Sequence, residues 1–344
     1  LCFKVELVNN TIEVLVPNRR LDIEIKQDLV EEIVRMYGYD KLNETLPAMT
    51  VEGELTHAQK IRKIVNKTLV GLGLSETISY SLVSPKLSNM CKVLFNDDFN
   101  EIKLLHPMTE EHSILRRSIV PSLIDVVKYN NARKNYNVSI YEIAQQYGLK
   151  DNEPKESYLL AGALQGVHTS TIWQDKKEVV DFYYVKGILD VMFERVGAKV
   201  KYAPLSISCP ELHPGRSAEI ILNNEVIGYV GELHPTLVKQ EDIEPTYVFE
   251  IKLEPLFNIS SDVIMFKQIS KVPSVERDLA LVMDQNILVG EVIDAIYRCD
   301  KNMIKKVSVF DIYVGDKIEA TKKSVAVRIT LESLDTLTDE VINQ

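Results

Sequence analysis

The chain has 344 residues, of which 45% are hydrophobic and 26% charged, and its formal net charge is −10. These are ordinary values for a globular protein of two or three domains. The negative charge does not fit a general nucleic-acid binder, so any RNA contact must come from local basic patches or be shared with a partner. No apolar run approaches the ~20 residues of a membrane span, and no signal peptide opens the chain.

The four cysteines lie far apart and form no Cys-x-x-Cys pair: Cys2, Cys91, Cys209 and Cys299. This pattern fits a reducing cytoplasm and argues against a structural zinc site. The chain begins within a predicted strand and ends just inside a capped helix, so we expect it to be a fragment of something longer.

The first segment is predicted to hold two strands, residues 5–8 and 11–16, joined by a turn at Asn9-Asn10. A helix that Asp28 caps and Gly38 ends is predicted to follow. Four carboxylates stand near the start of this helix: Asp22, Asp28, Glu31 and Glu32. A helix N-terminus favours negative charge, so capping and solvation explain them without a ligand. The alternative is a hard-cation site, because Mg²⁺ takes carboxylate oxygens and keeps several waters. The residues alone leave both interpretations open.

The middle of the chain alternates helices with antiparallel strands, which is typical of an α+β layer. Thr56 and Gln59 form a capping box before a helix with an apolar stripe at Ile61, Ile64, Val65, Thr68 and Leu72. Another helix has Pro121 in its first turn, and a third covers residues 181–196 and is closed by Gly197. Strands are predicted over residues 78–83, 138–147, 158–164 and 247–253, and the last of them is expected to close the sheet.

Residues 212–235 form the clearest hairpin of the chain. Two β-branched runs flank Asn223-Asn224, and Asn tolerates the positive φ of a tight turn. Gly228 and Gly231 predict close backbone approach. His213 and His234 each precede Pro and fit turn residues better than acid–base groups. No phosphate-binding glycine motif and no Ser/His/Asp order is visible anywhere in the chain.

The last segment follows the order strand, helix, strand, strand, helix, which is ferredoxin-like without the final strand. The strands are residues 279–283, 304–313 and 324–331, and Thr338 caps the last helix. Such a sheet can offer RNA a ring, a carboxylate and lysines, although Phe310 and Tyr313 would more often be core residues. From Lys271 onward the net charge is 10 − 13 = −3. Phosphate contact would then rest on a local cluster of Lys301, Lys305, Lys306, Lys322, Lys323 and Arg328.

Three dense motifs resemble the β subunit of bacterial phenylalanyl-tRNA synthetase. They are Val-Pro-x-Arg-Arg-x-Asp-Ile with Asp-Leu-x-Glu-Glu-Ile, then His-Pro-Gly-Arg-Ser-Ala with Gly-Tyr-Val-Gly-Glu-Leu-His-Pro, and finally Pro-Ser-Val-Glu-Arg-Asp-Leu-Ala-Leu-Val with Phe-Asp-Ile-Tyr. One departure is Leu42-Asn43, where the family usually has Ile-Pro. The resemblance implies an α+β fold with a class II synthetase-like antiparallel sheet and flanking helices, followed by a truncated ferredoxin-like domain.

The implied domains are the C-terminal part of a small acidic-motif domain (1–47), a catalytic-like core without its chemistry (50–262) and a C-terminally truncated anticodon-binding domain (270–344). In the core, Arg116 or Arg117 could mimic the phosphate-binding arginine of a class II site, but Pro214-Gly215-Arg216 lacks the second glycine–arginine segment. The helix that follows Thr56 becomes a candidate subunit contact. No residue of this chain is expected to be catalytic.

The resemblance also implies the ligand sites. Asp22, Asp28, Glu31 and Glu32 would hold a Mg²⁺ shared with the α subunit. Ala280, Asp311 and Tyr313 would lie against anticodon bases, with Lys322 and Lys323 near the tRNA backbone. The expected protein is a cytoplasmic phenylalanine–tRNA ligase, an (αβ)₂ heterotetramer that uses ATP, has no membrane contact and binds tRNA(Phe). The alternatives are a stand-alone nucleic-acid-binding module and a self-sufficient class II ligase.

Overall fold

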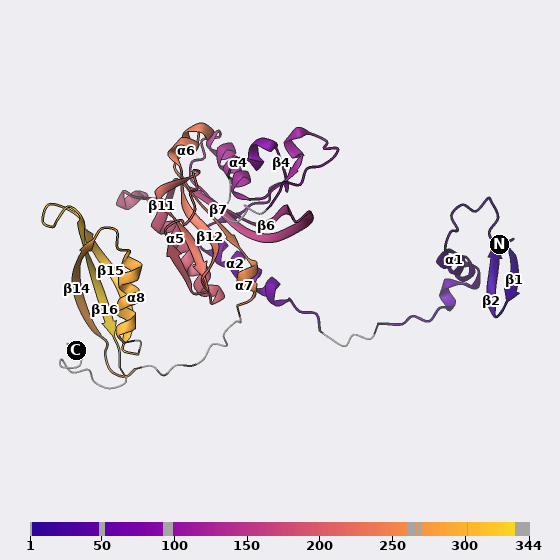
Figure 1. Cartoon of the computed structure of the whole chain (residues 1–344). Coiled ribbons are helices and arrows are strands. Elements are labelled where there is room, and N and C mark those ends of the chain that lie inside the picture. The colour runs from indigo at the N-terminus through magenta and orange to yellow at the C-terminus, as the bar shows by residue number, and fades with distance from the viewer. Residues whose placement is uncertain are drawn as a thin grey trace. The chain divides into compact units, whose positions relative to one another are not determined.

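The computed structural model describes residues 2–47, 52–91, 99–259, 266, 268, 270–300 and 302–333. The chain divides into two compact units, Leu1–Ile259 and Ser260–Gln344 (Figure 1). The helix predicted to begin at Thr338 lies outside the described residues. Within them, no helix has the length and apolar character needed to cross a membrane.

The N-terminal residues fold as an antiparallel hairpin followed by a helix. Strands β1 (Lys4–Val8) and β2 (Thr11–Leu15) meet at Asn9 and Asn10, whose φ angles of 47° and 61° confirm the predicted turn. Helix α1 (Lys26–Tyr37) ends at Gly38 as predicted, and the 3₁₀ helix η1 (Tyr39–Lys41) follows. The prediction that Asp28 is the N-cap is wrong, because the helix already begins at Lys26.

The core of the first unit is a seven-stranded sheet in the order β10-β11-β12-β13-β7-β6-β3. Its strands are β3 (Ser75–Glu76), β6 (Val138–Lys150), β7 (Glu153–Gln165), β10 (Val200–Ala203), β11 (Leu212–Leu222), β12 (Glu225–Leu233) and β13 (Thr246–Lys252). Neighbouring strands are antiparallel except β3, which runs parallel to β6.

Helices cover both faces of this sheet. Apolar residues of α2 (His57–Gly71) and α5 (Phe182–Val196) bury one face, including Val65, Leu69 and Leu189. On the opposite face α4 (Val120–Asn131) buries Leu123 and Ile124, and α6 (Pro235–Glu241) packs beside it. Burial of both faces stabilises the unit through the hydrophobic effect and leaves little of the sheet for ligands.

Several local predictions are confirmed. Thr56 and Gln59 form the capping box of α2, and Gly197 ends α5 at φ 78°. The helix predicted from Asp181 begins one residue later, with Asp181 as its N-cap. Asn223 and Asn224 turn the β11–β12 hairpin with φ angles of 51° and 67°. A Cβ on Gly228 would lie 2.5 Å from the carbonyl oxygen of Glu250, so the predicted close approach of the backbone is real.

Other predictions for the core are wrong. The strand predicted over residues 78–83 is reduced to β4 (Leu82–Val83), which pairs with β5 (Ile114–Leu115), and Ile78 is almost fully exposed. The strand that follows α2 is parallel, and β13 lies inside the sheet rather than closing it. The hairpin of β8 (Val167–Thr171) and β9 (Lys176–Val179) was not predicted at all. Short helices complete the unit: α3 (Pro85–Ser88), η2 (Glu110–His112), η3 (Ile172–Gln174) and α7 (Glu254–Phe257).

The second unit is a three-stranded antiparallel sheet in the order β14-β16-β15, with α8 (Val289–Cys299) against one face (Figure 1). Its strands are β14 (Val275–Asp284), β15 (Ile304–Tyr313) and β16 (Lys322–Leu331). Val325 and Val327 are fully buried on the helix side. We call the other side of this sheet the open face.

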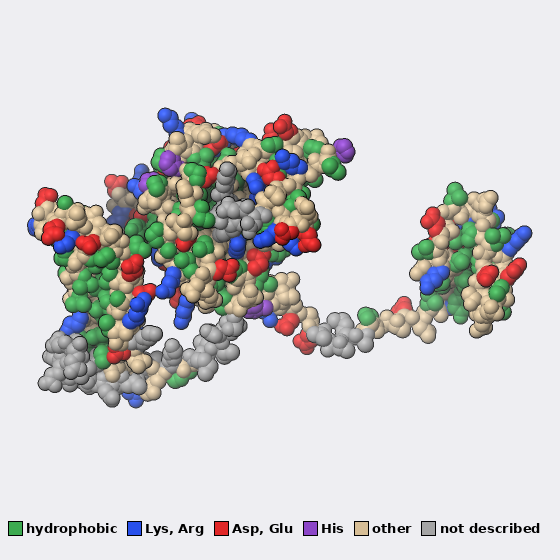
Figure 2. Space-filling model, in the orientation of Figure 1, with side chains coloured by type: hydrophobic (Ala, Val, Ile, Leu, Met, Phe, Trp, Pro, Cys, Tyr) green, Lys and Arg blue, Asp and Glu red, His purple; other side chains and the backbone are tan. Residues whose placement is uncertain are grey.

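Charged side chains of both signs are interspersed over the visible surface of each part of the chain, with hydrophobic side chains between them (Figure 2). No large region of one sign dominates this view, which agrees with the modest net charge. On the face seen in this view, an RNA-binding surface must be recognised from the arrangement of particular side chains.

Candidate functional site

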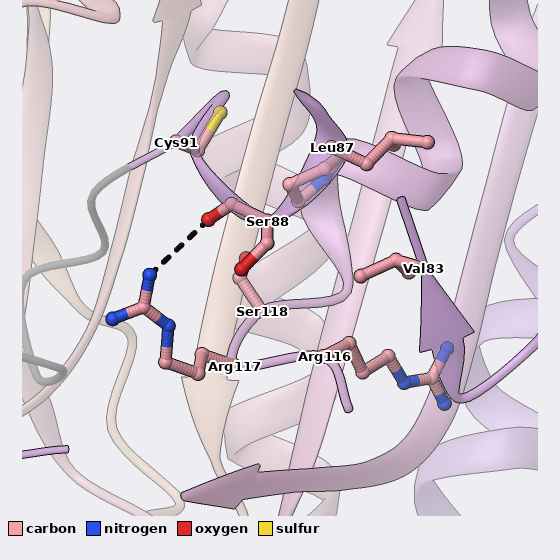
Figure 3. Close-up of a pocket in the computed structure, with 8 residues that line it drawn as sticks. Val83, Leu87, Ser88, Cys91, Arg116, Arg117 and Ser118 are labelled. Carbon is pink, nitrogen blue, oxygen red and sulfur yellow. Dashed lines mark hydrogen bonds between the residues drawn. The ribbon is translucent and has the colours of Figure 1, made fainter. Parts of the chain in front are cut away.

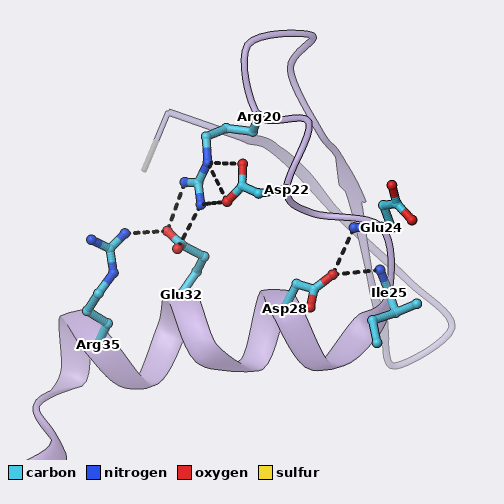
Figure 4. Close-up of polar contacts among 7 residues, drawn as sticks. All are labelled: Arg20, Asp22, Glu24, Ile25, Asp28, Glu32 and Arg35. Carbon is cyan, nitrogen blue, oxygen red and sulfur yellow. Dashed lines mark hydrogen bonds and ion pairs between the residues drawn. The ribbon is translucent and has the colours of Figure 1, made fainter. Parts of the chain in front are cut away.

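The predicted acidic cluster is organised around Arg20 (Figure 4). One guanidinium nitrogen, Nη2, lies 2.6 Å from Asp22 Oδ2 and 2.8 Å from Glu32 Oε1, and Nη1 donates to Glu32 Oε2 at 3.0 Å. Arg35 Nη2 also donates to Glu32, at 2.6 Å. Hydrogen bonds from Arg20 stabilise the charged carboxylates and lower the pKa of both Asp22 and Glu32 to about 2.

The other two predicted ligands lie apart from this network. Asp28 Oδ2 accepts the backbone N–H groups of Glu24 at 2.8 Å and Ile25 at 2.9 Å, and these bonds lower its pKa. It therefore satisfies two of the unpaired donors around the helix N-terminus. The side chain of Glu31 is exposed to solvent.

The carboxylates have the right chemistry for Mg²⁺, but their arrangement in this chain alone does not fit a Mg²⁺ ion. Arg20 already neutralises Asp22 and Glu32, and Asp28 is directed to the backbone. Across the described ranges, no three His, Cys, Asp or Glu side chains are placed to hold a metal. A Mg²⁺ shared with a second subunit stays a prediction.

The two candidate phosphate-binding arginines are occupied by protein groups. Arg116 is 3% exposed, and its Nη1 donates to Glu142 Oε1 at 2.9 Å and to Ser79 Oγ at 2.7 Å. Arg117 Nη2 lies 3.3 Å from both the carbonyl oxygen of Ser88 and Glu101 Oε1. Around a small pocket the two guanidinium groups point in different directions (Figure 3). They therefore do not converge on one anion.

The hairpin that resembles the end of a class II site is also used structurally. Arg216 Nη1 donates to Glu232 Oε2 at 2.8 Å, and Tyr247 donates to the same oxygen at 3.0 Å. His213 Nδ1 accepts the N–H of Gly215 at 3.1 Å, and His234 is the N-cap of α6. Both histidines thus occupy the predicted turn positions.

The three predicted anticodon residues come together on the open face. In the strand register, Ala280 of β14 is opposite Ala326 of β16, which is opposite Asp311 of β15. The next row along the strands contains Tyr313, opposite Ser324. Directly opposed residues project to the same side of a sheet, and that side is the one away from buried Val325 and Val327. The exposed carboxylate of Asp311 and the half-exposed ring of Tyr313 are neighbours there.

The predicted basic cluster is largely engaged within the unit. Lys322 Nζ lies 2.9 Å from Glu319 Oε2, and Lys323 Nζ donates to the carbonyl oxygens of Gln285 at 3.0 Å and Ile287 at 2.6 Å. Lys305 pairs with Glu332. Lys301 lies outside the described residues. The lysines therefore differ in their interactions, because Lys323 makes two hydrogen bonds to the backbone and Lys322 makes one ion pair.

Fold and site together define a mixed α+β chain with a helix-covered antiparallel sheet and a ferredoxin-like unit that exposes one sheet face. Three family models match it: a tRNA synthetase B5 domain at residues 1–39, the phenylalanyl-tRNA synthetase β-chain CLM domain at residues 42–253, and a ferredoxin-fold anticodon-binding domain at residues 270–344. The chain belongs to the phenylalanyl-tRNA synthetase β-chain family, and the resemblance seen in its motifs is confirmed.

Curated relatives agree with this membership. A phenylalanine–tRNA ligase β subunit of Geobacillus kaustophilus is 42% identical over 340 residues, covering 97% of this chain and 42% of the relative. One from Staphylococcus aureus is 41% identical over 347 residues, covering 99% and 43%. The chain thus spans less than half the length of these relatives. A pyrrolysyl-tRNA synthetase structure from Desulfitobacterium hafniense matches 57% of this chain and 64% of its own at 12% identity and a TM-score of 0.41, a likeness too low to bear on function.

Sequence reasoning missed the residues that decide what the carboxylates do. Arg20 stands two positions before Asp22 in the Arg-Arg-x-Asp motif, yet nothing local shows that it also reaches Glu32. Glu142 and Glu250 have no motif of their own, and their roles depend on tertiary contacts. The useful signal was the alternation of side chains in β15, which placed Asp311 and Tyr313 on one side.

Proposed function

We propose that this chain is part of the β subunit of a phenylalanine–tRNA ligase. In that role it scaffolds a catalytic α subunit and binds tRNA(Phe). The observation that carries the proposal is the open face, where Ala280, Asp311 and Tyr313 lie in adjacent rows of a unit that matches an anticodon-binding family. A carboxylate can accept from a base edge, and an aromatic ring can stack on an unpaired base. Such a face suits an RNA loop better than a duplex.

The proposed division of labour assigns ATP and phenylalanine to the α subunit. Arg116, Arg117 and Arg216 are each bound by protein acceptors, so none of these three candidates is poised for a triphosphate. The working complex would be a cytoplasmic (αβ)₂ heterotetramer that consumes ATP. Within this chain, residues 1–47, 50–262 and 270–344 would be the acidic-motif part, the scaffold and the anticodon reader.

The decisive experiment is co-purification with a bacterial phenylalanyl-tRNA synthetase α subunit, followed by an aminoacylation assay. Capture of α and charging of tRNA(Phe) would support the proposal. Phenylalanine-dependent pyrophosphate exchange by the chain alone would favour a self-sufficient ligase. RNA binding without any capture of α would favour a stand-alone RNA-binding module.

We further propose that the acidic cluster binds Mg²⁺ only when the α subunit is present. Asp22 and Glu32 are held by Arg20, so a cation would need both a rearranged arginine and ligands from outside this chain. Isothermal titration with Mg²⁺ should show no uptake by the chain alone and saturable uptake by the α-containing complex. Glu31→Gln should weaken that uptake, whereas Glu24→Gln, which removes a nearby exposed charge, should not. A complex that takes up no Mg²⁺ would contradict this assignment.

A further inference from the structure

A β-bulge in β15 brings a second aromatic ring to the open face. The register shifts between Val309, opposite Val327, and Asp311, opposite Ala326, so that Phe310 is the extra residue. A bulge interrupts strict alternation and re-aims a side chain. The ring of Phe310 is 55% exposed, and the guanidinium carbon of Arg328 lies 5.5 Å from its centroid. Because Arg328 stands two residues from Ala326 on β16, both Arg328 and Phe310 lie on the open face.

The guanidinium that faces this ring is held in place. Arg328 Nε and Nη2 each lie 2.8 Å from an oxygen of Asp278, the residue directly opposite on β14. These hydrogen bonds lower the pKa of Asp278, and Nη1 lies 3.6 Å from Glu276. A bidentate pair fixes the plane of a guanidinium as well as its position. Arg328 therefore supports the Phe310 ring from one side and leaves the remaining surface of the ring to solvent.

Between the two aromatic residues the surface is low except at Asp311. The row that separates Tyr313 from Arg328 contains the exposed carboxylate of Asp311 on β15, and beside it Ala280 and Ala326, whose side chains end at Cβ. Alternate residues of a strand are roughly 6.6 Å apart, so neighbouring rows offer separate positions for separate bases. Sheets that present two aromatic rings over a flat surface are known to stack two or three unpaired bases of RNA.

We propose that Phe310, positioned by Arg328 and Asp278, is a second base-stacking residue of the open face beside Tyr313. The ligand is an unpaired nucleobase of the tRNA loop, and the face then contacts at least two nucleotides. This inference rests on the proposed function, since it assumes that the open face meets tRNA. Phe310 touches the base, whereas Arg328 and Asp278 act through the ring.

The test uses the full chain in complex with the α subunit and measures equilibrium binding of tRNA(Phe). Loss of one stacked base is worth ~1–3 kcal/mol, so Phe310→Ala and Phe310→Leu should each weaken binding by about fivefold to a hundredfold. Phe310→Trp should bind like wild type, because it retains a flat ring. In a Trp173→Phe background, its fluorescence should be quenched by tRNA, since the chain has only one Trp. Ile312→Ala is the matched control, because Ile312 is 50% exposed on β15 but opposes Val325 on the helix side.

Abasic tRNAs sharpen the assignment. One abasic loop position should remove the base that Phe310 stacks on, so Phe310→Ala should not weaken the binding of that tRNA further. A second abasic position should do the same for Tyr313→Ala. Arg328→Lys keeps the charge but loses the bidentate bond with Asp278. It should therefore weaken the binding of wild-type tRNA, and it should not change the binding of the tRNA that lacks the base at the Phe310 position. If Tyr313→Ala weakens binding while Phe310→Leu binds like wild type, this inference is wrong and the proposed function stands. If neither substitution matters, the open face does not bind tRNA and both fail.

Discussion

The two sheets of this chain differ in what surrounds their polar and aromatic side chains. In the seven-stranded sheet both faces are covered by helices, and its buried carboxylates each meet a donor from the protein. Arg116 binds Glu142, Ser206 binds Glu219, Arg216 binds Glu232, and Ser118 binds Glu250. Burial of a charge is tolerated only with such partners. These groups are therefore needed by the fold.

The three-stranded sheet has a helix against one face, and the other face keeps Asp311, Tyr313 and Phe310 at the surface. Exposed aromatic rings contribute little to a core and are available for stacking. The comparison suggests that what covers a sheet decides whether its polar and aromatic residues serve stability or recognition. Substitutions in the first sheet should therefore change unfolding, and substitutions on the open face should change RNA binding.

The largest effect is expected where a buried ion pair is broken. The side chains of Arg116 and Glu142 are each 3% exposed, so Arg116→Met leaves a buried carboxylate unpaired and should destabilise the first unit by about 3–5 kcal/mol. Urea unfolding followed by near-ultraviolet circular dichroism measures this unit, because its tyrosines Tyr141, Tyr229 and Tyr247 are buried in the folded state. Lys60→Met, which breaks an exposed pair with Glu54, should cost less than ~1 kcal/mol. Adding Glu142→Leu to Arg116→Met should recover much of the loss. If Arg116→Met is as stable as wild type, the buried ion pair does not stabilise the first unit, and the proposed difference between the two sheets is wrong.

The second effect is a pH dependence of unfolding caused by Glu250. Complete burial raises its pKa from 4.5 to about 7, although Ser118 and the Ile119 N–H bond to Oε1; among the described residues, Oε2 has no hydrogen-bond partner. Arg116 opposes this rise in pKa. The folded state holds the proton more tightly, so the free energy of unfolding should fall by about 3 kcal/mol as the pH rises from 4.5 to 7, and should level off above pH 7.

Glu250→Gln should remove that part of the pH profile because it cannot ionise. Glu153→Gln, at the exposed β6–β7 turn, is the control and should leave the profile as in wild type. The free energy of unfolding is to be measured in urea at several pH values. A Glu250→Gln variant that keeps the full slope would show that another group titrates.

On the open face, Tyr313→Ala should weaken tRNA(Phe) binding by roughly tenfold or more while leaving urea unfolding of the first unit unchanged. Asp311→Asn should affect affinity less than discrimination, because it alters which base edge can pair. Aminoacylation with wild-type and anticodon-altered tRNA separates the two effects. If Tyr313→Ala charges both tRNAs as wild type does, Tyr313 is structural and the site is misassigned.

Local signals in the sequence predicted local structure well. The capping box of α2, the Asn pairs of both hairpins and the glycine after α5 depend on neighbouring residues only, and each is where the pattern placed it. Sheet order is a tertiary property, so β13 was expected at an edge although it lies between β12 and β7. A short parallel strand such as β3 has no periodicity to reveal it.

The same difference between local and tertiary features applies to the candidate sites. Period-two alternation predicts that Asp311 and Tyr313 share a face, and the register agrees. It cannot place Phe310, because a bulge breaks the alternation at that residue. The partner of Glu32 was equally invisible, since Arg20 reaches it across 12 positions of the chain. Residue types therefore indicated where chemistry gathers, and tertiary contacts decided which groups stay available.

The smallest effect is expected from the lysines at the start of β16, and it separates two kinds of lysine. Lys322 makes an exposed ion pair with Glu319, which is readily exchanged for a phosphate. Lys322→Ala should therefore weaken every tRNA alike, by a few-fold, and reduce the slope of log affinity against log salt by about 0.7, the value for a single-stranded contact. Lys323 instead donates to two backbone carbonyls after β14, so Lys323→Ala should loosen that loop and leave the salt slope nearly unchanged. Binding measured from about 50 to 300 mM salt tests both; a Lys322→Ala variant that alters discrimination between tRNAs would show that this side chain contacts a base.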